Sequence, residues 1–259
     1  MDKTFSTPVG DHKVIDPITP RIAEIVGPAG AGKTTLCQAL NGSSQLIQAC
    51  NFPDVRKISD APFFIWNALQ IFRDLHRIPP RKSRKLTRRE FAWLTILNGW
   101  PVVLQKNLKN SNSFFILDQG PIYLMTELSV SGPEYLSSLK ARVMWRTFYR
   151  RWASLLDVIV WLDCDDKYLL DRIRTRQKEH FVRDKSPQTI FTFLDRYRNA
   201  YEHTISMLAA HRPNLKVLRF NTTRQSPDEI VNELLTEFGL QTPIPLTLQH
   251  TLGILNESK

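Results

Sequence analysis

The sequence has few cysteines and no long apolar run, and each shortage excludes a class of protein. Its three cysteines, Cys37, Cys50 and Cys164, lie far apart, which argues against a disulfide framework and against a zinc site. Residues 1–20 are polar and contain three prolines, without the apolar core of a signal peptide. No stretch reaches the roughly 18 apolar residues of a membrane span. We therefore expect a cytoplasmic protein with no membrane partner and a flexible extension at residues 1–20.

Acidic residues are also in the minority. Lys and Arg number 35 against 25 Asp and Glu, which gives a formal net charge of +10. Such an excess favours anionic partners, which include phosphorylated small molecules, nucleic acid and anionic surfaces, and charge alone does not choose among them. The apolar content of 42% is typical of a globular protein with a sizeable core.

Apolar runs alternate with segments of helical periodicity along most of the chain. The expected strands are residues 21–26, 114–118, 157–163 and 216–221, with a weaker candidate at 45–50. The expected helices are 33–41, 61–77, 87–100, 133–156, 166–180, 189–211 and 226–239. The last of them has Ser226 as N-cap, Pro227 at its first position and Gly239 at its end. This alternation predicts a three-layer α/β/α sandwich with a mainly parallel sheet, formed by residues 21–241 and followed by an irregular tail at 242–259.

Glycine is scarce, yet three of the ten glycines lie in "GPAGAG" at 27–32. Gly27, Gly32, Lys33 and Thr34 satisfy the Walker A pattern G-x-x-x-x-G-K-[ST], between an expected strand and an expected helix. Such a loop directs backbone N–H groups and a helix N-terminus at phosphate oxygens, while the lysine reaches the outer phosphates and the threonine holds magnesium. The sequence therefore predicts that ATP, in preference to GTP, binds with Mg²⁺ at Gly27, Pro28, Ala29, Gly30, Ala31, Gly32, Lys33, Thr34 and Thr35.

A second candidate site residue is Asp118, which ends the apolar run of "FFILDQGP". A carboxylate at the end of a parallel strand lies at the same sheet edge as the phosphate loop, so Asp118 is expected to bind magnesium directly or through water. The alternative is that Asp118 caps the following turn, because "DQGP" is turn-like in any protein.

A third candidate region is the basic segment "DRIRTRQKEH". Arg172 and Arg176 are four residues apart and share one helix face. Arginines on a flexible lid, here about residues 172–188, would offset the charge of a phosphoryl group in transfer. The alternative is a solvated basic face.

Together, "GPAGAGKTT", "ILDQGP", "VIVWLDCDDKYLLDRIRTRQ" and "FNTTRQSPDEIVNELL" resemble the nucleoside and nucleotide kinases among the P-loop NTPases, thymidylate kinases especially. The resemblance covers about residues 20–240. It implies a magnesium-dependent kinase in which Lys33 and Thr34 bind ATP and magnesium, Asp118 lies on the magnesium side, and Arg172 and Arg176 contact the transferring phosphoryl. One departure is Gln119, which stands where the family has an arginine that contacts acceptor phosphate, so a nucleoside monophosphate acceptor is in doubt.

Two further segments leave alternatives open. The basic run 77–89 lies in the expected acceptor-binding region, about 51–110, where it could receive an anionic or polar small-molecule acceptor, contact nucleic acid or form a solvated loop. Nucleic acid is not favoured, because no aromatic residues are interleaved with the basic ones. Asp54 is either an acceptor-side base or a turn residue. The second functional hypothesis is a P-loop ATPase that switches a partner or acts at nucleic acid, and a third is nucleotide binding without transfer.

The segment "RVMWRTFYRRW" at 142–152 has two stripes. One stripe holds Arg142, Arg146 and Arg150. The other holds Trp145, Phe148 or Tyr149, and Trp152, and we expect it to be core or subunit interface rather than a base-stacking surface, so a homodimer stays open.

Overall fold

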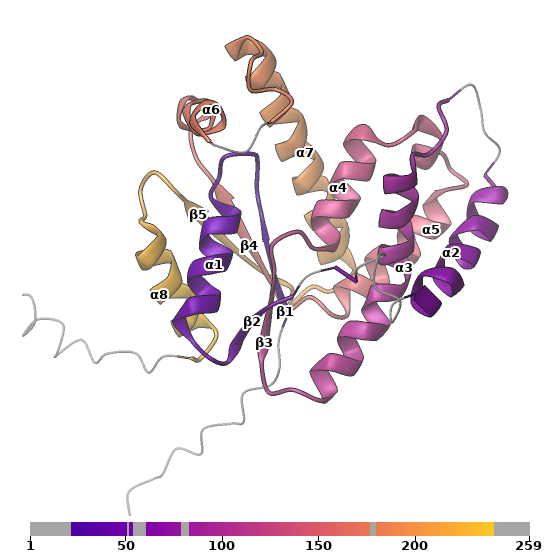
Figure 1. Cartoon of the computed structure of the whole chain (residues 1–259), viewed down its shortest axis with the longest axis horizontal. Helices are drawn as coiled ribbons and strands as arrows, with labels where there is room; N and C mark the ends of the chain where they lie inside the picture. The colour runs from indigo at the N-terminus through magenta and orange to yellow at the C-terminus, as the bar shows by residue number, and fades with distance from the viewer. Residues whose placement is uncertain (1–21, 51, 54–60, 79–82, 177–179, 241–259) are drawn as a thin grey trace, which may run out of the picture.

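Five parallel strands form the centre of the structure, in the order β2-β3-β1-β4-β5 (Figure 1). The computed structural model describes residues 22–50, 52–53, 61–78, 83–176 and 180–240. The strands are β1 (Ile22–Val26), β2 (Ile47–Ala49), β3 (Phe114–Leu117), β4 (Val158–Asp163) and β5 (Lys216–Asn221). Every pairing among them is parallel, so the expected α/β class with a parallel sheet is confirmed.

Helices cover both faces of this sheet. One face carries α1 (Lys33–Ser43) and α8 (Pro227–Glu237), and the other carries α3 (Arg88–Lys109), α4 (Pro121–Ser131), α5 (Arg142–Ala153) and α7 (Pro187–His211). The remaining helices are α2 (Ala61–His76), which packs on α3, and α6 (Asp166–Thr175). Successive side chains of β1 alternate between two cores, since Ile22 and Val26 belong to one and Ala23 and Ile25 to the other. The predicted three-layer sandwich is therefore the observed architecture.

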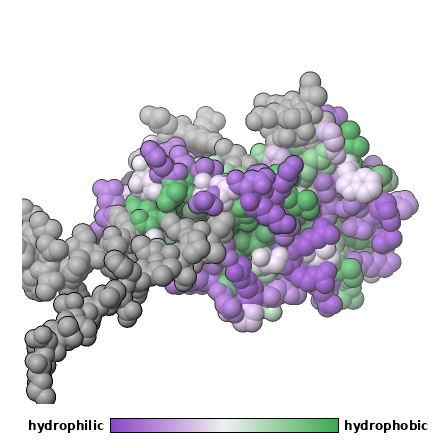
Figure 2. Space-filling model, turned by 90° about the horizontal axis from the view of Figure 1, so that it is seen from below, coloured by the Kyte–Doolittle hydropathy of each residue, from purple (hydrophilic) through white to green (hydrophobic). Residues whose placement is uncertain are grey.

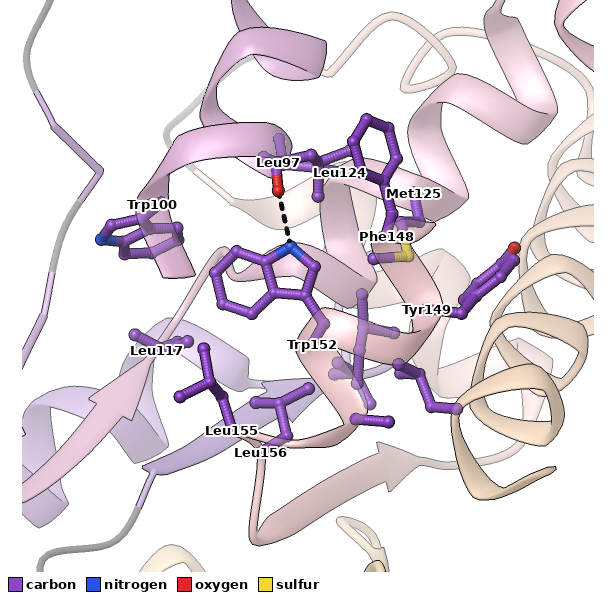
Figure 3. Close-up of a cluster of buried hydrophobic side chains, with 14 of the residues drawn as sticks. Leu97, Trp100, Leu117, Leu124, Met125, Phe148, Tyr149, Trp152, Leu155 and Leu156 are labelled. Atoms are coloured by element: carbon purple, nitrogen blue, oxygen red, sulfur yellow. Dashed lines mark hydrogen bonds between the residues drawn. The ribbon is translucent and has the colours of Figure 1, made fainter. Parts of the chain in front are cut away.

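The larger core lies under α3, α4, α5 and α7 and is rich in aromatic side chains (Figure 3). Trp152 is fully buried, and its indole Nε1–H donates a hydrogen bond of 3.0 Å to the Leu97 carbonyl oxygen. Its ring meets that of Trp100 edge to face at 5.6 Å between centroids. The aromatic stripe at 142–152 is thus core, while Arg142, Arg146 and Arg150 are exposed.

Several expected helix boundaries were wrong for identifiable reasons. The expected helix 133–156 is a short 3-10 helix, η2 (Glu134–Ser137), followed by α5. The chain is extended at Ser138, whose hydroxyl accepts a hydrogen bond of 3.3 Å from the Ala141 N–H, a local bond that competes with helix continuation. Helix α3 continues past Pro101 to Lys109, and α6 ends at Thr175 rather than at 180.

Helix α4 was not expected at all. Most of its first eight residues are buried, so the sequence shows no amphipathic stripe there. By contrast, α8 begins as expected, with Ser226 as N-cap in a capping box with Glu229 and with Pro227 at its first position.

Some expectations lie outside the described residues. These are the extension at 1–20, the tail at 242–259 and Asp54, together with residues 79–82 of the basic run and 177–179 of the expected lid. Within the described ranges, no helix is both long and apolar enough to cross a membrane. Seen from below, at the end opposite the loop that joins β1 to α1, the coloured surface is mostly hydrophilic with smaller hydrophobic patches (Figure 2).

Candidate functional site

A cavity of about 800 Å³ opens at the carboxyl ends of the strands, where Gly27 follows β1 and Asp118 follows β3. This edge is where open parallel sheets bind ligands. Eight of the nine residues expected to bind nucleotide line the cavity: Gly27, Ala29, Gly30, Ala31, Gly32, Lys33, Thr34 and Thr35. Further lining residues come from α3, α4, α6 and α7, so the cavity extends well beyond the loop.

The loop between β1 and α1, residues 27–32, depends on glycine at its first position. Gly27 has a φ of 145°, and a Cβ there would lie 2.0 Å from the Leu162 carbonyl oxygen of β4. The last loop residue, Gly32, is the N-cap of α1 and offers no side chain to its first N–H groups, and the first turn holds no acidic residue. The first amides of α1 therefore remain available to an anion at the positive end of the helix.

Lys33 folds back over this loop. Its ammonium donates hydrogen bonds to the carbonyl oxygens of Gly27 at 2.8 Å and Pro28 at 2.9 Å. Burial, with a smaller contribution from nearby Arg176, lowers the pKa of Lys33 to about 8, although Asp118 opposes both effects. A bound phosphate would supply the negative charge that favours the ammonium form.

Thr34 and Asp118 come together as the sequence predicts. The Thr34 hydroxyl donates a hydrogen bond of 3.0 Å to Asp118 Oδ2. Mg²⁺ prefers hard oxygen ligands and usually takes only one or two from the protein, with waters and substrate phosphates completing its shell. A threonine hydroxyl and a carboxylate beside a phosphate loop fit that ion.

Sequence reasoning missed the residue that holds the Asp118 turn in place. Glu24, on central strand β1, is fully buried and accepts hydrogen bonds of 2.9 Å from the N–H groups of both Ile122 and Tyr123. It thereby caps α4, which begins directly after the turn. Burial raises the pKa of Glu24 to about 8. A Cβ on Gly120 would lie 2.5 Å from the Glu24 carboxyl carbon, so this turn needs glycine. The only sequence signal was an acidic residue inside the apolar run "IAEIV".

The two candidate arginines differ in their surroundings. Arg172 Nη1 donates to Thr222 Oγ1 at 2.8 Å, and its Nη2 donates to the Thr222 carbonyl oxygen at 3.0 Å. These bonds tie α6 to the end of β5. Arg176 caps the C-terminus of α6, and both arginines line the cavity. Both arginines thus line the cavity, but Arg176 lies just past the end of α6 instead of on its face, and the guanidinium of Arg172 already binds another part of the chain.

The wall formed by α3, α4 and α7 contains residues that no motif indicated. Arg89 lies over the Trp93 ring, with its guanidinium carbon 4.6 Å from the ring centre. Glu127 Oε2 accepts a hydrogen bond of 3.2 Å from the Tyr197 hydroxyl. Arg89, Tyr123, Glu127 and Tyr197 all line the cavity, as does Gln119 of the Asp118 turn, which the sequence already singles out. Of the residues on these three helices, only Arg89 belongs to a segment that the sequence singles out, the basic run 77–89.

That basic run does not act as one unit. Arg84 Nη1 donates a hydrogen bond of 2.9 Å to Glu90 Oε2 and so supports the start of α3. Glu90 is also the partner of Thr87 in a capping box. Of these two described arginines, Arg84 is hydrogen-bonded to Glu90 at the start of α3, and Arg89 lines the cavity.

No family model and no curated protein matches the chain. Among solved structures, it is similar to deoxyadenosine kinase from M. mycoides with the product dCMP and a flexible dCDP bound, at 14% identity over 85% of this chain and 100% of that chain, with a TM-score of 0.49. The same kinase with bound dATP is 13% identical over 85% of this chain and 99% of that chain, with a TM-score of 0.47. Thymidylate kinase from Candida albicans is 13% identical over 86% of this chain and 92% of that chain, with a TM-score of 0.49. These likenesses concern the course of the chain, and the chemistry follows from the side chains of the cavity.

Proposed function

We propose that the protein is a magnesium-dependent kinase that transfers the terminal phosphoryl group of ATP to a small acceptor. The observation that carries this proposal is that one cavity joins the phosphate loop, the Thr34–Asp118 pair and a separate polar and aromatic wall. Its volume of about 800 Å³ lies toward the upper end of the range for small-molecule sites, which leaves room for a second ligand beside the phosphates.

Each part of the phosphate side has a defined task in this scheme. The loop amides and the N-terminus of α1 hold the phosphates, and Lys33 moves from the Gly27 and Pro28 carbonyl oxygens to the outer phosphates. Thr34 and Asp118 would hold Mg²⁺, which when bound neutralises charge on the phosphate oxygens. Arg176 offsets the charge of the transferring phosphoryl group, and Arg172 fixes α6 beside it.

The acceptor binds against the wall of α3, α4 and α7. Arg89, Glu127 and Tyr197 provide polar groups of different kinds, and the rings of Tyr123 and Phe193 provide apolar surface. Such a mixture of a few polar groups and aromatic rings is typical of small-molecule sites. With acceptor and ATP in one cavity, transfer is favoured over hydrolysis because water is displaced.

The second candidate function is a P-loop ATPase that acts at nucleic acid. Its support is the exposed row of Arg142, Arg146 and Arg150 on α5, none of which lines the cavity. Retention on nucleic acid that falls steeply with salt would favour it, and no retention at low salt would exclude it.

The deciding experiment is ADP release from Mg-ATP by the whole chain, alone and with a panel of nucleosides, nucleotides and sugars. We expect one acceptor to stimulate release and Lys33→Ala to abolish it. Lys140→Ala is the matched control, since Lys140 is exposed and does not line the cavity. Full activity of Lys33→Ala would contradict the kinase scheme. Release that ignores every acceptor but rises with nucleic acid would favour the ATPase.

A further inference from the structure

Glu127 is a carboxylate on the acceptor wall that the scheme above leaves without a chemical task. It is half-buried on α4, one helical turn after Tyr123, and lines the cavity. Its Oε2 accepts the hydrogen bond from Tyr197 of α7, and Tyr123 also hydrogen-bonds to it. Two helices thus fix its position, while the positive charges of Arg89 on α3 and Lys33 on α1 both act on it.

These two cations locate Glu127 within the cavity. Lys33 belongs to the phosphate side and Arg89 to the acceptor wall. The carboxylate that interacts with both therefore lies where the terminal phosphoryl group and an acceptor would meet. Among the described lining residues the other carboxylate is Asp118, which accepts the Thr34 hydrogen bond on the proposed magnesium side. The surroundings of the two carboxylates therefore differ: those of Asp118 suit a metal ion, and those of Glu127 suit the uptake of a proton.

The charges of the wall also distinguish between acceptor classes. Among the described lining residues, α3 and α4 contribute one cation, Arg89, and one anion, Glu127, while neutral Gln119 directly follows Asp118. A phosphate acceptor attacks through an oxygen that is already ionised, so it needs no base, and a nearby carboxylate would repel it. A hydroxyl acceptor carries a proton that must leave, and a carboxylate within reach accepts it.

We propose that Glu127 is the general base of the site and that the acceptor is a hydroxyl compound without phosphate at the receiving position. This inference rests on the proposed kinase function. The acceptor O–H proton passes to the Glu127 carboxylate as the acceptor oxygen bonds to the terminal phosphorus of ATP. The bond from that phosphorus to the bridging oxygen breaks, and its electron pair leaves with ADP. The products are ADP, the phosphorylated acceptor and protonated Glu127, which then returns its proton to solvent.

The surroundings of Glu127 suit this task. Burial raises its pKa, which makes the carboxylate a better proton acceptor, while Tyr197, Arg89, Tyr123 and Lys33 favour its ionised form. Burial also raises the pKa values of Tyr123 and Tyr197 to about 12, so both remain protonated donors to Glu127 at neutral pH. The base is therefore held in one orientation before an acceptor arrives.

The test compares Glu127→Gln with Glu134→Gln, an exposed glutamate that does not line the cavity. Water serves first as the simplest hydroxyl acceptor, measured as ADP release from Mg-ATP alone. Deoxyadenosine and its 5′-monophosphate then form a matched pair of probes. We expect Glu127→Gln to lower the turnover of hydroxyl acceptors about 10²–10⁴-fold. The KM for ATP should not change, and Glu134→Gln should behave as the unmodified chain.

The pH profile separates a base from a merely structural residue. In the unmodified chain, turnover should rise with pH as Glu127 loses its proton, and this rising limb should vanish in Glu127→Gln. Glu127→Gln turnover equal to that of the unmodified chain would overturn the inference, as would stimulation by the monophosphate and not by the nucleoside. ADP release that does not depend on Lys33 would instead defeat the proposed function itself. Release that depends on Lys33 but not on Glu127 would defeat only this inference.

Discussion

The Thr34 hydroxyl lies 3.0 Å from Asp118 Oδ2, although 84 positions separate the two residues in the chain. Two segments that lie far apart in the chain thus meet at one point of the sheet edge. The parallel pairing of β1 with β3 produces this meeting, since it sets both strand ends side by side.

Replacement of Asp118 should change the magnesium requirement before it changes anything else. Asp118→Asn keeps an oxygen near Thr34 but removes the charge that attracts the ion, so we expect roughly 10–100-fold more Mg²⁺ to be needed for half-maximal ADP release. The measurement is a magnesium titration at saturating ATP. Asp171→Asn, at an exposed position of α6, is the control. An unchanged requirement for Asp118→Asn would mean that the carboxylate only caps its turn.

Gly120 should not tolerate a side chain. A Cβ there meets the Glu24 carboxylate, so Gly120→Ala should lower the free energy of unfolding by about 1–3 kcal/mol, as overpacking does in a dense core. At Gly42 in α1, a Cβ would have no neighbour within 4 Å, and Gly42→Ala should be neutral or stabilise the helix by about 0.5–1 kcal/mol. Urea unfolding measures the free energy of unfolding of both variants. Equal values for Gly120→Ala and Gly42→Ala would contradict the close approach of Gly120 to Glu24.

Glu24 should make stability depend on pH. Its pKa is about 8 in the folded chain against 4.5 ordinarily, so the folded state holds the proton more tightly. The contribution of Glu24 to the free energy of unfolding is complete below pH 4.5 and is lost as pH rises toward 8. Over this range the free energy of unfolding should fall by up to about 1.4 kcal/mol per pH unit. In Glu24→Gln this slope should disappear. Urea unfolding of both chains from pH 5 to 9 measures the difference, and parallel curves would refute it.

Arg172 and Arg176 should separate into a structural and a functional residue. Arg172→Ala removes two hydrogen bonds to Thr222 and should cost about 1–3 kcal/mol of unfolding free energy. Arg176→Ala should leave stability within about 0.5 kcal/mol and lower turnover about 10³-fold, the effect expected of an arginine that offsets phosphoryl charge. Unfolding and ADP release are measured on both variants. A stable Arg172→Ala, or a fully active Arg176→Ala, would reverse the assignment.

The sequence was informative where local backbone lines the cavity. The loop at 27–32 could be predicted because its glycines and Lys33 act within one turn of chain. Asp118 could be predicted because a strand end is visible as the end of an apolar run. Helix α4 could not be predicted, because a helix buried on most sides has no periodic pattern.

Contacts between distant segments were equally hidden. Arg172 meets Thr222 across 50 positions, and Glu127 meets Tyr197 across 70. The packing of α6 and α7 against the sheet brings these pairs together, and neither pair has a spacing that sequence periodicity could reveal. The side of the cavity lined by residues 27–35 could therefore be predicted from the sequence, and the wall formed by α3, α4 and α7 could not.

The close approach of Glu24 to Gly120 constrains which residues can occur together at these two positions in related chains. Because the carboxylate fills the space that a side chain at position 120 would need, the two positions cannot vary independently. In related chains, a larger residue after the Asp-Gln pair should occur only together with a smaller residue in the middle of the first strand. Loss of the glutamate would in turn leave the first amides of the following helix in need of another partner. Related chains in which Glu24 or Gly120 is replaced should therefore have both residues replaced.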